Sequence, residues 1–289
     1  MYYLLFLFLP MLASLKVAVQ GKLTRNNNAG LSGLCRINAA VFGATAIIMA
    51  ALFLRSAPTA GVLTAALLYG IFGVLFQLFY MMAFATGSIG ATAAINNFGV
   101  VFSIIAGIFV YNEPISAFKI VGIVLMVIPF VLLPKRDGGG FGGGKWLLFS
   151  VIAVLSSGAS NLLMLICSHN GFSVENSRQV VIFGYAAACL ISLAIMNLLP
   201  GSKIKCNAFG DRLFLLKTAG VAVPLGLYNV LLSSGLHYIP GSVLIPVVSV
   251  LSMSAILLID LILFRQKLTV RQYIGLGMAV LCVVLLNIG

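Results

Sequence analysis

Lys16 is the residue of this sequence whose type and position indicate the most specific function, the binding of an anionic group. It lies well inside an apolar run near the start of the chain, and no acidic residue in that run neutralises it. A cation inside a membrane is costly unless it has a partner or faces water, so it marks a functional site by default. We therefore predict that Lys16 holds an anionic group of a substrate. Two alternatives stay open, since its long stem could reach the lipid interface or its amine could pair with Asp260.

Two adjacent amides, Asn96 and Asn97, interrupt another apolar run. Amides inside a membrane either hydrogen-bond to neighbouring helices or face a polar ligand, and both interpretations fit here. The sharper hypothesis places the pair in one cavity with Lys16. A substrate held there would meet a positive charge and amide groups together.

The chain has few residues that could act as catalytic acids, bases or metal ligands. The 2 histidines, His169 and His237, have no acidic neighbour at ligand spacing, and the chain has 5 acidic residues in all. The 5 cysteines are scattered without a Cys-x-x-Cys pair, so they predict neither a disulfide framework nor a zinc site. We expect no enzyme activity, no cofactor and no metal, and we keep an intramembrane enzyme as the weaker alternative.

Membrane helices are the elements that must position these residues. Of 289 residues, 62% are hydrophobic and 8% are charged, whereas soluble domains average roughly 45–50% apolar and about 25% charged residues. A span needs about 20 apolar residues, so the chain predicts an all-α integral membrane protein with about ten transmembrane helices. The first is expected to be a retained helix and not a signal peptide. The expected spans lie near 2–21, 36–54, 61–86, 90–111, 117–134, 146–168, 177–199, 213–236, 241–264 and 271–288.

The chain also divides near its midpoint. A Gly-rich linker at 135–145 separates a first part, 1–134, from a second part, 146–289. When the two parts are aligned so that Glu113 falls on Gln266, two turns that precede glycine-containing helices coincide. Five helices is an odd number, so two similar parts in tandem must enter the membrane with opposite orientations. We predict two inverted five-helix repeats.

A family resemblance rests on the same turns. The segment 111–122, with Glu113-Pro-Ile-Ser116 inside it, resembles the Gly-Glu-x-hydrophobic-Ser turn of the ten-helix EamA-like branch of the drug/metabolite transporter (DMT) superfamily. Its second copy is 264–275, with Gln266 where the family usually has Glu. The second helix of each half also opens on an arginine, Arg36 or Arg178. The length of the chain and its expected number of spans also fit the family, so the resemblance covers the whole chain.

The chain departs from the family pattern at three places. The first helix has Ser14-Leu15-Lys16 where a Trp-Gly pair is common, and Asn96-Asn97 replaces a proline that often opens the fourth helix. The glutamate on which small four-helix multidrug transporters depend has no counterpart in the first helix. Proton-driven export of cationic drugs is therefore not what the resemblance implies.

The resemblance implies a cavity lined by the third, fourth, eighth and ninth helices. Polar residues on these helices are candidate lining residues, and Lys16 joins them on the charge argument. For the serines, close helix packing is the alternative interpretation. The candidate substrate-binding residues are Lys16, Gln77, Tyr80, Asn96, Asn97, Tyr228, Asn229, Ser233, Ser249 and Ser252.

These observations predict a secondary transporter that moves a small organic metabolite by alternating access. The Gly-rich run at 138–144 follows no strand and ends in no Gly-Lys-Ser/Thr, so it predicts no nucleotide site and no direct use of ATP. The expected partners are a small-molecule substrate with an anionic group and the lipid bilayer, with the chain acting as a monomer or homodimer. A non-transporting scaffold or accessory subunit is the alternative function.

The Lys and Arg residues that give the net charge of +12 lie mostly in the expected short loops, where they face lipid head groups. We therefore expect no nucleic acid partner. We expect a multi-pass protein of a bacterial inner (plasma) membrane. Most Lys and Arg residues lie in alternate loops, beginning with the loop after the first helix. The positive-inside rule then puts both termini outside the cytoplasm, whereas the family resemblance implies that both are inside.

Overall fold

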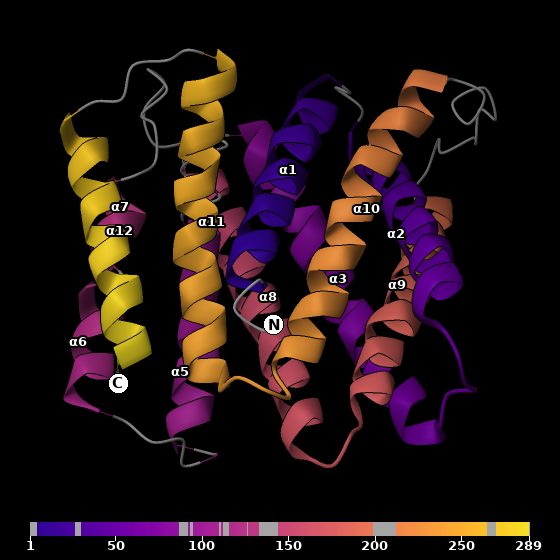
Figure 1. Cartoon of the computed structure of the whole chain (residues 1–289). Helices are drawn as coiled ribbons and strands as arrows, with labels where there is room; N and C mark the ends of the chain where they lie inside the picture. Colours follow the sequence, from indigo (N-terminus) through magenta and orange to yellow (C-terminus); the bar gives the residue numbers. More distant parts are fainter. Residues whose placement is uncertain are drawn as a thin grey trace.

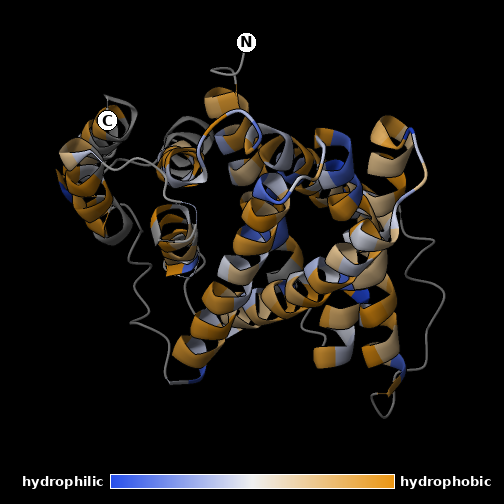
Figure 2. Cartoon of the chain, turned by 90° about the horizontal axis from the view of Figure 1, so that it is seen from below, coloured by the Kyte–Doolittle hydropathy of each residue, from blue (hydrophilic) through white to orange (hydrophobic). Residues whose placement is uncertain are grey.

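The computed structural model shows a helical bundle (Figure 1). It describes residues 5–26, 30–86, 92, 95–109, 111, 116–125, 127–132, 144–198, 212–264 and 270–288, and within this part of the chain it contains no strand. Hydrophobic residues cover most of the length of the helices (Figure 2). The helical class predicted from the sequence is confirmed.

The first half of the chain begins with three long helices. These are α1 (Leu5–Asn26), α2 (Leu31–Phe53) and α3 (Ala60–Thr86). A short 3-10 turn, η2 (Asn97–Gly99), leads into α5 (Val100–Phe109). Two short helices, α6 (Ala117–Leu125) and α7 (Val127–Leu132), follow it.

The described residues of the second half form five helices. They are α8 (Gly144–His169), α9 (Val174–Leu198), α10 (Arg212–Gly235), α11 (Gly241–Phe264) and α12 (Val270–Ile288). Five helices of the described residues are long and apolar enough to cross a membrane: α2, α3, α8, α9 and the 214–235 part of α10. Shorter apolar stretches lie at 5–20 in α1 and 241–252 in α11.

Short turns connect the long helices at one end of the bundle. Residues 54–59, 170–173 and 236–240 form this short-turn end, which lies at the bottom of Figure 1. Gly171 has φ of 81°, a left-handed conformation that glycine adopts without a Cβ penalty. The expected turn before Gly241 is confirmed, whereas the expected turn at 87–90 and the linker at 135–143 lie outside the described residues.

One boundary prediction was wrong. Arg36 and Arg178 do not open their helices, because α2 begins at Leu31 and α9 at Val174. A first helical turn tolerates polar residues such as Ser32 and Glu175, since its N–H groups have no partner within the helix. Helices α6 and α7 both lie within the expected fifth span, and Met126 between them lies outside the described residues.

The two halves pack on each other reciprocally. The third helix of the first half, α3, packs against α8 and α9, and the third helix of the second half, α10, packs against α1 and α2. In the same way α1 packs against α11, and α5 against α8. Helices α6, α7 and α12 pack together at one side of the bundle (Figure 1).

Glycines allow the closest of these contacts. A Cβ on Gly70 of α3 would lie 2.7 Å from the carbonyl oxygen of Gly184 on α9, and a Cβ on Gly184 would lie 2.6 Å from the Tyr69 ring. Real Cβ atoms do not approach so closely, so glycine at these positions lets the two backbones meet. Small residues serve helix packing in membranes in this way.

Candidate functional site

A cavity of about 160 Å³ lies between the two halves of the bundle. It is lined by residues of α1, α2, α3, α5, α8, α9, α10 and α11, together with Asn96. Polar groups alternate with aromatic rings on its wall. The lining residues include Lys16, Phe42, Tyr69, Gly73, Phe76, Gln77, Tyr80, Asn96, Ser157, Ser160, Asn161, Tyr185, Tyr228, Asn229, Ser249 and Ser252.

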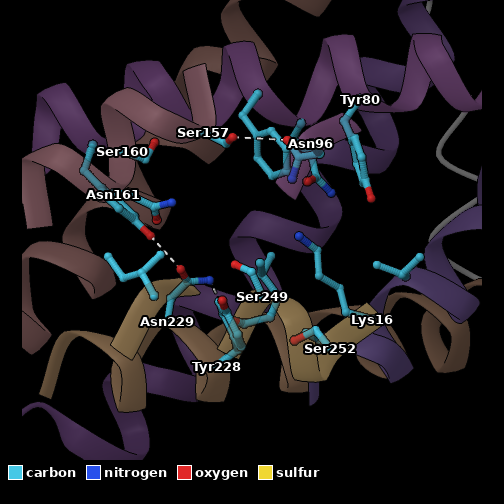
Figure 3. Close-up of a pocket in the computed structure, with 18 of the residues that line it drawn as sticks. Lys16, Tyr80, Asn96, Ser157, Ser160, Asn161, Tyr228, Asn229, Ser249 and Ser252 are labelled. Carbon is cyan, nitrogen blue, oxygen red and sulfur yellow. Dashed lines mark hydrogen bonds between the residues drawn. The ribbon is translucent and has the colours of Figure 1, made fainter. Parts of the chain in front are cut away.

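Lys16 projects into this cavity from α1 (Figure 3). Its side chain is half-buried, and its amine lies 5.2 Å from the centre of the Phe76 ring on α3. A cation over an aromatic face is attracted by the ring quadrupole. The described lining residues include no carboxylate, so Lys16 is their only charged group.

Asn96 lies opposite Lys16 across the cavity (Figure 3). Its amide oxygen accepts a hydrogen bond of 3.1 Å from the Ser157 hydroxyl of α8. This bond ties the two halves together and orients the amide. The Asn96 nitrogen then keeps its two N–H groups for the cavity.

Gln77 and Tyr80 lie on one face of α3 and are 1% and 3% exposed. The ring of Tyr80 packs 5.1 Å from that of Phe76 and 4.2 Å from that of Phe84. The Gln77 side-chain oxygen Oε1 is buried and has no hydrogen-bond partner in the structure. A buried acceptor of this kind costs free energy until a donor reaches it.

The part of the cavity nearest the short-turn end is closed by aromatic side chains from both halves. The Phe42 and Tyr185 rings stack at 5.6 Å, and Tyr69 meets Tyr185 edge to face at 5.9 Å. The Tyr69 hydroxyl donates to Asn229 Oδ1 at 3.0 Å, and the Asn229 amide nitrogen donates to the Leu225 carbonyl at 2.9 Å. These contacts join α2 and α3 to α9 and α10.

Polar contacts hold the short-turn end itself. The Gln179 amide nitrogen donates to Ser56 Oγ at 2.8 Å and to the Ser56 carbonyl at 3.0 Å, which links the two halves. Arg178 Nε donates to Ser234 Oγ at 2.8 Å, and its guanidinium lies 5.9 Å from the Phe53 ring.

His237 belongs to the same end of the bundle. Its Nε2 lies 2.9 Å from the Ser177 hydroxyl, within hydrogen-bond distance. Burial lowers the pKa of His237 below its usual range, and the charges of Arg178 and His169 lower that pKa further. The neutral imidazole is therefore favoured in the folded protein.

The structure brings most of the predicted site residues to this cavity. Ser252 lines it while its hydroxyl donates to the Val248 carbonyl at 2.6 Å. Ser233 does not reach the cavity, because it is buried and its hydroxyl donates to the Val230 carbonyl of its own helix. The Asn97 side chain lies outside the described residues. The predicted residues found at the cavity are Lys16, Gln77, Tyr80, Asn96, Tyr228, Asn229, Ser249 and Ser252.

Sequence reasoning missed part of the wall. Ser160 and Asn161 are polar residues within an apolar run, so the criterion that selected Asn96 would have found them. Tyr69 lies on the same expected span as Tyr80, so the criterion that selected Tyr80 applies to it as well, whereas Tyr185 lies on a span outside the four that the resemblance implied.

The arrangement suits reversible binding. Its groups are one amine, several amides and hydroxyls, and aromatic rings, and they include no paired nucleophile and base. Among the described residues no group of three His, Cys, Asp or Glu side chains could hold a metal ion. Substrate contact by these residues stays a prediction.

Residues 2–133 match the EamA-like transporter family. Over these residues the chain is similar to that family, whose members are transporters. A crystal structure described only as that of a protein is similar over 99% of this chain and 96% of its own, with a TM-score of 0.75 and 15% identity, so the two share a fold. No curated protein matches the chain. With five helices among the described residues that are long and apolar enough to cross a membrane, the chain is a multi-pass membrane protein.

Proposed function

We propose that this EamA-like protein is a secondary transporter that carries a small organic metabolite across a bacterial inner membrane by alternating access. The observation that carries the proposal is the polar cavity between the two halves, whose wall includes Lys16, Asn96, Asn161 and Asn229. Secondary transporters bind their substrates at such a place, near the middle of the membrane between their repeats.

The reciprocal packing supports an architecture of ten spans in two inverted repeats. The third helix of each half packs on the first two helices of the other, and the first helix of each half packs on the fourth of the other, if η2 and α5 complete the fourth span. Exchanging the halves leaves this pattern unchanged. A two-fold axis in the membrane plane produces such an exchange.

One-sided closure supports alternating access. Tyr69, Tyr185 and Asn229 close the cavity toward the short-turn end, and Gln179 ties that end to Ser56. These contacts lie between the halves, so a rocking motion could break them, together with the close α3–α9 packing at Gly70 and Gly184, without unfolding either half. The cavity would then open toward the short-turn end.

Flux into liposomes tests the proposal, after a screen of pooled metabolites for ligands that stabilise the purified protein. A ligand at 100 times its Kd stabilises by about 2.7 kcal/mol, which a thermal scan detects. The stabilising compound should be transported, and Gly73→Leu should block its flux, because a Cβ on Gly73 meets nothing within 4 Å and the longer side chain would fill the cavity.

The control for this variant is Gly277→Leu on α12, where a Cβ also meets nothing within 4 Å but the residue does not line the cavity. It should transport normally. A stabilising ligand that is never transported would favour the scaffold or accessory function instead.

A further inference from the structure

We infer that the solute is a small organic acid with a single carboxylate, which Lys16, Asn96 and Tyr80 hold. This inference rests on the proposed function, since it names the class of solute that the same cavity takes.

Three hydrogen-bond donors converge at this part of the cavity. The Lys16 amine, the Asn96 amide and the Tyr80 hydroxyl come from three separate segments and point toward the same space (Figure 3). The Asn96 oxygen is already engaged by Ser157, which leaves the nitrogen as the free end of the amide. A carboxylate has two oxygens with about four acceptor positions, so it can receive all three donors.

The charge of the wall selects a monoanion. Lys16 is the only charged group among the described lining residues. The side chain of Asp260, the other partner considered for Lys16, lies outside the described part of the structure. A carboxylate neutralises one amine. A phosphate monoester carries about −1.5 to −2 charges at neutral pH and would leave negative charge uncompensated. An organic cation would be repelled, because charges interact strongly where water is scarce.

Phe76 supplies an apolar surface beside the carboxylate position. Its ring centre lies 5.2 Å from the Lys16 amine. A solute that binds its carboxylate at Lys16 therefore brings the adjoining part of its body next to an aromatic ring.

The size of the cavity sets an upper limit for the solute. A volume of about 160 Å³ is close to that of an engineered cavity of about 150 Å³ that binds benzene. Acids with a short chain or one ring fit this space. The rings of Phe76, Tyr80 and Tyr228 provide apolar surface for such a body.

Binding to purified protein in detergent tests the inference with matched probes. Lactate, mandelate and 3-phenyllactate are 2-hydroxy acids, lactamide and mandelamide are their neutral counterparts, 2-amino-1-phenylethanol is a cation, and phenyl phosphate is a phosphate monoester. At millimolar concentration at least one of the three acids should raise the unfolding temperature, and the other four compounds should not.

Variants connect the binding to the named residues. Lys16→Gln should weaken binding of the acid at least tenfold, Lys16→Arg should retain part of it, and Tyr80→Phe should weaken it roughly tenfold, as expected for loss of a hydrogen bond to a charged group. Lys145→Gln is the matched control, because Lys145 is exposed and lies outside the cavity. If Lys16→Gln does not fold, binding of the acid to Lys16→Arg and Tyr80→Phe tests the inference instead.

The inference is overturned if none of the three acids stabilises the protein, if the amine or the phosphate binds as well as the acids, or if a folded Lys16→Gln binds an acid normally. Proteoliposome flux separates this failure from failure of the proposed function. If an amine is transported and Gly73→Leu blocks its flux, the protein is a transporter but the carboxylate site is wrong. If an acid binds at Lys16 but is never transported, the carboxylate site is right but the proposed transport function is wrong.

Discussion

The Tyr69 hydroxyl donates a hydrogen bond of 3.0 Å to the side-chain oxygen of Asn229, and this bond joins α3 of the first half to α10 of the second. Tyr69→Phe removes the bond and keeps the ring beside Tyr185. A lost hydrogen bond costs about 0.5–1.5 kcal/mol. We expect the short-turn end of the variant to open more often than that of the wild type.

Spin labels at Ala57 and Asn170 measure this opening, because both residues are exposed and lie at the short-turn end in different halves. The distance distribution should shift to longer values in Tyr69→Phe. The matched control is Tyr273→Phe, an exposed tyrosine of α12 outside the cavity. An unchanged distribution in Tyr69→Phe would mean that this bond does not hold the end closed.

Two glycines three residues apart on α3 should respond differently to alanine. A Cβ on Gly70 would meet backbone atoms of α9, whereas a Cβ on Gly73 meets nothing within 4 Å. Overpacking of this kind costs about 1–3 kcal/mol. Gly70→Ala should therefore lower the unfolding temperature, and Gly73→Ala should leave it near the wild-type value. Equal stability of the two variants would show that α3 and α9 can separate at little cost.

Stability should depend on pH through His237. Its pKa is lowered in the folded protein by burial and by the charges of Arg178 and His169, so the unfolded chain binds the proton more readily. The penalty is absent well above the unfolded pKa of about 6.5 and grows as the pH falls below it, until the folded pKa is passed.

His237→Gln should remove part of the loss of stability between neutral and mildly acidic pH. Thermal scans of both proteins across this range give the comparison. If the two curves of unfolding temperature against pH run parallel, another group causes the acid sensitivity.

Asn96 and Ser157 form one hydrogen bond but should contribute unequally to transport. Asn96→Ala removes a group that faces the solute, so the solute concentration for half-maximal flux should rise several-fold. Ser157→Ala removes only the partner that orients this amide, and a smaller rise is expected. Similar unfolding temperatures of the two variants would show that assembly is intact, and an equal or reversed effect on flux contradicts the assignment.

Much of the fold could be predicted because membrane spans have a simple physical signature. A bilayer requires an apolar run of sufficient length, and α3 was expected at 61–86 and lies at Ala60–Thr86. The predicted positions of the helix ends were less accurate. The first residues of α2, Leu31-Ser-Gly-Leu-Cys35, lie between the polar run 26–28 and Arg36. The apolar criterion assigns them to a loop, because hydropathy reports contact with lipid and not backbone hydrogen bonding.

The cavity could be predicted where a polar side chain interrupts an apolar helix, as at Lys16, Gln77 and Asn96. Ser233 meets the same criterion but donates to its own helix, because a serine hydroxyl can satisfy itself on the carbonyl of a preceding turn. The aromatic closure by Phe42 and Tyr185 was not predictable, since their contact depends on the crossing of α2 and α9 and not on any local pattern.

The reciprocal packing of the halves also constrains how the chain is made. Ribosomes release the first half before the second, and domains usually fold in that order. Yet α3 completes its contacts only against α8 and α9, and α1 only against α10 and α11. Early in synthesis the nascent chain therefore holds Lys16 and Gln77 in the membrane before their neighbours exist. Assembly of the bundle must wait for its C-terminal helices, and an insertase or chaperone that shields α1 and α3 during that interval would raise the yield of folded protein.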